Sequence, residues 1–117
     1  MTSYQRGRKG EALAREFLVK AGYSTVAARW RSRFGEIDLI VRDRKFIVFV
    51  EVKLRKNSHF AYAREYVSKN KQDKIKTTAS LWLSCHSTAL QPRFDVIEVY
   101  LPDETSAPLI NHIKNAF

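Results

Sequence analysis

Two short apolar segments of this chain carry charged residues at positions where a buried strand is normally apolar. Asp38 lies within the run from Ile37 to Val41. Glu51 lies within the run from Phe46 to Val52, and Lys53 is the first residue after this run. A charged side chain that is buried without a partner is strongly destabilising. A metal ion with oxygen ligands and a neighbouring cation explains the three charged residues together, and this chemistry suits phosphodiester hydrolysis.

The length and charge of the chain indicate a single basic domain. With 117 residues, it is expected to form one domain over residues 1–117. It carries 21 Lys and Arg against 12 Asp and Glu, which gives a formal net charge of +9 at pH 7. This excess favours an anionic partner, most simply a nucleic acid and here DNA, although basic proteins without such a partner also exist.

Cysteine usage and hydropathy favour a cytoplasmic protein with no membrane association. Cys85 is the only cysteine, so the chain cannot form an internal disulfide, and a reducing compartment is expected. The polar and basic residues 1–10 lack the apolar core of a signal peptide. The longest wholly apolar run, from Phe46 to Val50, is far too short to span a bilayer.

Apolar periodicity and turn residues predict a chain of alternating helices and strands. The predicted elements are a helix at about 5–21, strands at 23–30, 36–41 and 46–54, a helix at 71–86 and a strand at 94–101. Short polar connections at 32–35 and 42–45 make the first three strands an antiparallel meander.

The element order αβββαβ predicts an α/β fold with a small mixed sheet flanked by helices. Because a helix connects the third and fourth strands, these two strands are expected to run parallel. Segment 56–70 has no clean period, and a short helix is left open there. Residues 103–108 read as a loop and residues 109–117 as a short terminal helix.

Alternation along the strands is expected to bring the charged residues together. Alternate side chains of a strand point to opposite faces, so Glu51 and Lys53 share one face, about 6.5–7 Å apart along the strand. In the preceding strand, Glu36 and Asp38 share a face opposite a set of apolar residues, namely Ile37, Leu39 and Val41. If the two strands form a hairpin, Asp38 and Glu51 converge near one end of the sheet.

Two converging carboxylates favour a bound cation, because they repel each other when both are ionised. Mg²⁺ or Mn²⁺ fits best, since both prefer oxygen ligands, and the backbone carbonyl of Val52 could supply a third. Lys53 then has two open roles: it stabilises the charge that develops on the phosphate, or it helps to activate water. Glu11 is a further candidate ligand, because on a helical wheel it lies only ~20° from Leu18, at the rim of the apolar face.

Each of these residues also has a purely structural interpretation. Glu51 and Lys53 could form a same-face ion pair worth ~0.2–1 kcal/mol. Glu11 could simply be favoured near the start of its helix by the helix dipole. Asp95 lies close to Arg93 and is expected to form a local ion pair rather than to act as a fourth ligand. The combination of charges in such apolar strands favours the metal site over these separate explanations.

Five short blocks, in order over roughly residues 5–100, give the chain a resemblance to a known family. The blocks are Gly7-x-x-Gly10-Glu11, then Gly35 to Ile40, Val48 to Lys53 with Arg55, Lys71-Gln72, and Arg93 to Val96. In these residues the chain resembles the YraN family of small endonucleases. That family is placed in the PD-(D/E)xK, or restriction-endonuclease-like, superfamily, beside archaeal Holliday junction resolvases.

The resemblance implies a restriction-endonuclease-like αβββαβ core, metal ligation by Asp38 and Glu51, and Lys53 as the catalytic lysine. It also implies that Glu11 occupies the acidic position of the first core helix, and by analogy with junction-cleaving relatives it implies a homodimer. The chain departs from the family pattern at Arg29, where Asn is usual, and at Ala61, where Gly is usual. These departures concern loop shape and substrate contacts, not the metal site.

Basic and polar residues on either side of the site strands are candidates for phosphate contact. The candidates are Arg31, Arg33, Arg55, Lys71, Gln72 and Lys74. An ordinary solvated surface is the alternative for each of them.

The main hypothesis is a Mg²⁺- or Mn²⁺-dependent endonuclease acting on DNA, including structured or branched DNA. A second hypothesis is a nucleic-acid-binding module without catalysis, serving a DNA repair or uptake complex. A third is an RNA-processing enzyme. Metal titration separates the first two, and competition between RNA and DNA separates the third.

Overall fold

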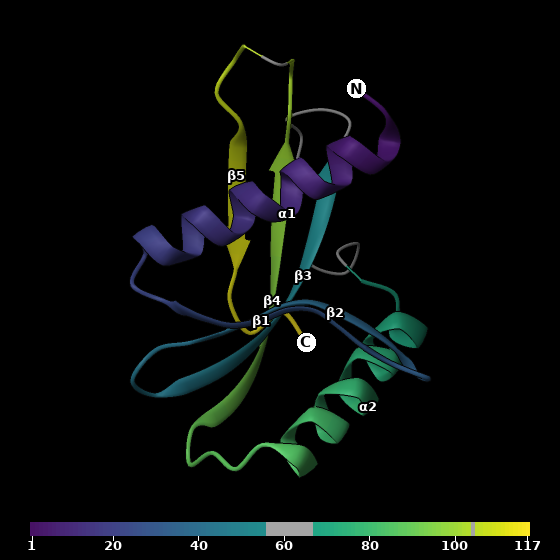
Figure 1. Cartoon of the computed structure of the whole chain (residues 1–117), viewed down its shortest axis with the longest axis vertical. Coiled ribbons are helices and arrows are strands. Elements are labelled where there is room, and N and C mark those ends of the chain that lie inside the picture. The colour runs from purple at the N-terminus through teal and green to yellow at the C-terminus, as the bar shows by residue number, and fades with distance from the viewer. Residues whose placement is uncertain (56–66, 104) are drawn as a thin grey trace.

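The computed structural model describes residues 1–55, 67–103 and 105–117. Its elements, labelled in Figure 1, are α1 (Ser3–Lys20), β1 (Ser24–Ser32), β2 (Gly35–Arg42), β3 (Phe46–Arg55), α2 (Lys69–Cys85), β4 (Gln91–Tyr100) and β5 (Leu109–Ile113). Ala61 and most of the 56–70 segment, where a short helix was left open, lie outside the described residues. No helix in the described part of the chain is long and apolar enough to cross a membrane.

The strands form one mixed sheet in the order β1-β2-β3-β4-β5. β2 pairs antiparallel with β1 on one side and with β3 on the other. β3 and β4 are parallel, and β5 is antiparallel to β4. The predicted mixed sheet, the three-strand meander and the parallel third and fourth strands are therefore confirmed. The parallel pairing is possible because α2 carries the chain back across the sheet between these two strands.

One helix packs against each face of the sheet. On one face, Ala14 and Leu18 of α1 pack with Leu39, Val48 and Val50. On the other face, Ile75, Ala79 and Trp82 of α2 pack with Ile47 and Phe49 of β3. The alternation predicted along β3 is confirmed, because its successive residues join opposite clusters.

The expected helix at 109–117 is wrong, because residues 109–113 form the edge strand β5. Val99 pairs with Ile110 and Ile97 with His112, which satisfies backbone groups of β4 that would otherwise lie at the sheet edge. Polar side chains of β5 also find partners on β4: the side chain of Asn111 donates to Glu98 at 2.9 Å. Tertiary pairing therefore overrides a nine-residue helical pattern too short to be stable alone.

A buried network of hydrogen bonds links β4 to neighbouring segments of the chain. Asp95 is fully buried, and its carboxylate accepts hydrogen bonds from Arg93 Nε and Nη2, both at 2.8 Å, and from His112 Nε2 at 2.7 Å. The backbone N–H of Asn115 donates to it at 3.0 Å, and Arg93 also donates to Tyr23 Oη at 2.7 Å. Burial alone would raise the pKa of Asp95, but the hydrogen bonds from His112 and Arg93 lower it overall. Asp95 thus has a structural role, as the sequence predicts.

Replacing Asp95 should strongly destabilise the protein. In Asp95→Ala, the buried Arg93 loses its carboxylate partner, so the free energy of unfolding should fall by about 3–5 kcal/mol, as measured by urea denaturation. Asp73→Ala is a matched control, because Asp73 forms an exposed pair with Lys69, and its loss should cost below about 0.5 kcal/mol. Equal effects of the two substitutions would contradict the assignment.

Candidate metal centre

Asp38 lies at the point where β2 separates from β3. The two strands pair only from Arg42 with Ile47 to Leu39 with Val50. Beyond this point the Asp38 carboxylate takes the place of a backbone acceptor, because its Oδ2 accepts a hydrogen bond from Val52 N–H at 2.8 Å. The carboxylate is therefore held in a fixed position at the end of the ladder.

The predicted face pattern of β2 is wrong at Ile37. Leu39 packs in the cluster beneath α1, but Ile37 packs in the cluster beneath α2. The cause lies in β1: Ala28 pairs with Leu39 and Trp30 with Ile37, so Arg29 stands opposite Asp38. Arg29 has φ +52°, a left-handed conformation that interrupts the extended strand. The irregularity turns the side chains before Asp38 relative to those after it.

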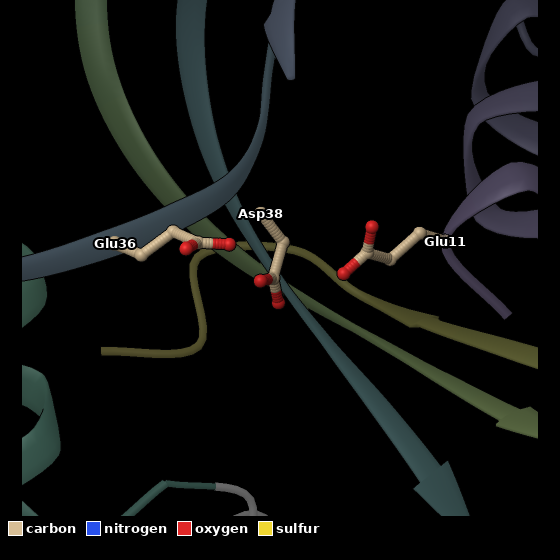
Figure 2. Close-up of side chains that lie close together, drawn as sticks. All are labelled: Glu11, Glu36 and Asp38. Carbon is tan, nitrogen blue, oxygen red and sulfur yellow. The ribbon is translucent and has the colours of Figure 1, made fainter. Parts of the chain in front are cut away.

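Three carboxylates converge beside this irregularity (Figure 2). Glu11 of α1 and Glu36 and Asp38 of β2 each bring one oxygen to within 4.8 Å of the other two. All three side chains are half-buried. The pKa of Glu11 is raised, first by burial and then by the Asp38 charge. Such a group of hard oxygen donors, partly shielded from water, fits Mg²⁺ or Mn²⁺.

The place of Glu11 depends on close packing of α1 against β3. Gly10 is buried in α1, and a Cβ at this position would overlap the end of the Leu54 side chain. The glycine therefore lets the helix approach the sheet closely just where Glu11 leaves it. Glu11 thus leaves the helix at the rim of its apolar face, as expected, and its carboxylate lies near that of Asp38 (Figure 2).

Glu51 lies among cations and is influenced by the charge of Asp38. Its side chain is 7% exposed, and the Nζ atoms of Lys53 and Lys71 lie 3.5 and 3.9 Å from its Oε1. Burial, and then the charge of Asp38, raise the pKa of Glu51 to about 7, although both lysines act in the opposite direction. The pKa of Asp38 is raised as well, chiefly by burial, while the hydrogen bond from Val52 lowers it.

The structure thus joins the predicted residues in a different arrangement from the expected one. Asp38, Glu51 and Lys53 form one connected electrostatic group, as predicted from strand alternation. Glu11 meets Asp38 together with Glu36, and Glu51 is outside that three-carboxylate cluster. The N–H of Val52 is used by Asp38. Its carbonyl stays a predicted ligand.

Two arginines neutralise part of the carboxylate cluster. Arg29 Nε lies 3.8 Å from Glu11 Oε2 and 3.6 Å from Glu36 Oε1. Arg31 Nε donates to Glu36 Oε2 at 2.6 Å. Arg31, a predicted phosphate contact, is therefore engaged with Glu36.

The other candidates for phosphate contact differ in their surroundings. Arg55 donates to the buried Glu98 at 2.6 Å, and Gln72 donates to the carbonyl of Val67 at 3.0 Å. Arg33 and Lys74 are exposed, and both line a small cavity at the turn between β1 and β2. Contact of this whole set with nucleic acid stays a prediction.

Comparison with known proteins gives the chain a family. The model of a family described as "Uncharacterised protein family UPF0102" matches residues 10–99. The chain belongs to this family. The match spans the acidic and lysine residues of the site, and it confirms the resemblance to the YraN family seen in the sequence.

Relatives within UPF0102 match the chain over most of their length. A UPF0102 protein of Caldicellulosiruptor bescii is 42% identical over all of both chains. One from Caldanaerobacter subterraneus is 42% identical over 95% of this chain and 93% of its own. One from Photobacterium profundum is 42% identical over 86% of this chain and 82% of its own.

Glu36 and Lys71 are the site residues whose places the sequence did not reveal. Glu36 is two residues before Asp38, and this strand alternation could have indicated it as a ligand, but the predicted ligands do not include it. Lys71 was expected to contact phosphate, and the structure places it beside Glu51. Its approach depends on how α2 packs on the sheet, which strand alternation cannot predict.

The raised pKa of Glu51 predicts how stability depends on pH in this UPF0102 protein without metal. The ordinary value is 4.5 and the folded value about 7, so the folded state binds the proton more tightly. The contribution of Glu51 to stability is therefore fully present below pH 4.5 and is lost as the pH rises through about 7.

Glu51→Gln should remove this dependence. In EDTA, the variant should unfold at higher urea concentration than the wild type at pH 8, with a gain on the order of 2 kcal/mol that disappears near pH 4. Glu16→Gln, an exposed change on α1, should follow the wild type at every pH. If Glu51→Gln and the wild type differed in free energy of unfolding by the same amount at pH 4 and at pH 8, the prediction would be contradicted.

Proposed function

We propose that this protein is a Mg²⁺- or Mn²⁺-dependent nuclease that hydrolyses phosphodiester bonds in DNA. The observation that carries the proposal is the position of Asp38. Its fixed carboxylate lies beside those of Glu11 and Glu36. Its charge also acts on the buried Glu51, which pairs with Lys53. Arg29 and Arg31 pair with Glu11 and Glu36 and offset part of this negative charge. The remaining repulsion between carboxylates that converge on one point would be relieved by a bound divalent cation.

Asp38 and Glu51 would hold the metal ion, with Glu11 as a further ligand. A bound divalent ion supplies a water of lowered pKa and neutralises negative charge on the phosphate. The hydrogen bond from Val52 orients Asp38 before any ligand arrives, which limits the loss of side-chain entropy on binding.

Lys53 is suited to act on the reacting phosphate. Its ammonium is 3.5 Å from Glu51 and its side chain is 32% exposed, so it is accessible to a substrate from the site. It can stabilise the negative charge of the pentavalent phosphate or help to orient and activate the water. The formal charge of +9 supports an anionic polymer as substrate.

The resemblance to the YraN family and the superfamily of restriction-endonuclease-like enzymes supports the same reaction. The described elements α1 to β4 follow the αβββαβ order that the resemblance implies. The homodimer and the cytoplasmic location expected from the sequence stay predictions.

Substitution of the three central residues should separate cleavage from binding. Asp38→Asn, Glu51→Gln and Lys53→Ala should each lower the cleavage rate by roughly 100-fold or more, with DNA affinity retained. Suitable substrates are duplex, flap, single-stranded and four-way DNA and a matched RNA, each with Mg²⁺, Mn²⁺ or EDTA. Glu16→Gln and Lys20→Ala, which break an exposed pair on α1, serve as controls with unchanged rates. Full activity of Glu51→Gln would reject the proposal.

Calorimetric titration with Mn²⁺ should show which carboxylates bind the ion. Asp38→Asn and Glu51→Gln should each weaken binding by about tenfold or more, because they remove a charged ligand. Glu36→Gln should change the affinity by less than about threefold, because Glu36 is already paired with Arg31 at 2.6 Å. No Mn²⁺ binding by the wild type, even with DNA present, would favour the module without catalysis.

A further inference from the structure

The turn between β1 and β2 presents an exposed aromatic ring. Ser32 pairs with Gly35, so Arg33 and Phe34 alone form the turn. Phe34 is 39% exposed, which is high for a side chain of this size and hydrophobicity. Glu36 of the carboxylate cluster follows only two residues later. The ring is thus presented close to the candidate metal centre.

The turn lies against α2 (Figure 1). Ser32 Oγ and Thr78 Oγ1 of α2 are 3.3 Å apart, and the Phe34 N–H donates to Ser32 Oγ at 3.0 Å, so the turn is held in place. Gly35 has φ +153° and lies against Thr78, at a place where a side chain would be strained. Because the backbone is already ordered, a ligand that stacks on Phe34 pays little conformational entropy for the turn.

Two cations, Arg33 and Lys74, lie near the ring, and Asp73 lines the same cavity. The guanidinium of Arg33 lies over the Phe34 ring, 4.9 Å from its centroid. A cavity of about 300 Å³ is lined by Phe34 and Arg33 of the turn and by Asp73, Lys74 and Thr77 of α2. An aromatic face with adjacent positive charges is the arrangement that binds a nucleobase together with its phosphate.

We propose that Phe34 and Arg33 form a binding site for an unpaired nucleobase, and that the substrate therefore contains a single-stranded DNA segment next to the cleaved bond. This inference rests on the proposed nuclease function. A base inside a duplex is stacked on both sides, and its face is accessible only after it is flipped out. An unpaired base offers its face directly, and stacking tolerates any sequence.

Binding measured in EDTA tests the site without cleavage. Fluorescence anisotropy would compare a single-stranded DNA with a blunt duplex of the same sequence. Phe34→Ala should weaken single-strand binding about tenfold and leave duplex binding nearly unchanged, and Phe34→Trp should restore it. Val26→Ala, which alters an equally exposed apolar residue outside the turn, on β1, is the matched control and should bind as the wild type does. A single-stranded DNA with 2-aminopurine should show quenching with wild type that Phe34→Ala reduces.

The outcomes separate this inference from the proposed function. If Phe34→Ala binds both DNAs like the wild type, or weakens both equally, the nucleobase site is rejected while wild-type cleavage in Mn²⁺ still supports the nuclease. If the wild type does not cleave any DNA in Mn²⁺, the nuclease is rejected whatever Phe34 does. Because the Phe34 ring is exposed, thermal unfolding of Phe34→Ala should match that of the wild type, which excludes misfolding as the cause of weaker binding.

Discussion

The hydrogen bond from Val52 to Asp38 is the interaction on which the candidate site depends. It is formed where β2 leaves β3, so a side-chain carboxylate replaces the backbone acceptor that the ladder no longer provides. Asp38 therefore lies where the β2–β3 pairing ends, within reach of both Glu11 of α1 and Glu51 of β3. A continuous β2–β3 ladder would keep the two faces of the sheet apart.

The electrostatics of the region follow from that geometry. Burial and mutual repulsion raise the pKa values of Glu11, Asp38 and Glu51. Arg29 and Arg31 lie on the Glu36 side, while Lys53 and Lys71 lie beside Glu51. Carboxylates at the centre with cations around them suit a bound divalent ion with an anionic polymer over it. The Asp95 network shows the contrasting case, in which hydrogen bonds fully satisfy one buried carboxylate and leave it structural.

Much of the fold could be predicted because the decisive signals are local. Short polar turns imply adjacent antiparallel strands, and a helix between β3 and β4 permits parallel pairing. Alternation along β3 correctly placed Glu51 and Lys53 on one face. The prediction failed for β5, whose pairing with β4 is a tertiary interaction, and for Ile37, whose direction changes where Arg29 leaves the extended conformation. Neither event has a signal in the periodicity of its own segment.

The sequence by itself determined which charged residues are forced into apolar strands, and hence that Asp38, Glu51 and Lys53 require partners. Only the tertiary structure decided which residues are those partners. Glu36 and Lys71 join the site because of a backbone irregularity and the packing of a helix, each of which depends on contacts between residues far apart in the chain. The physical reason is that local patterns fix the direction of a side chain along its own element, whereas the distance between elements is set by how their apolar faces pack.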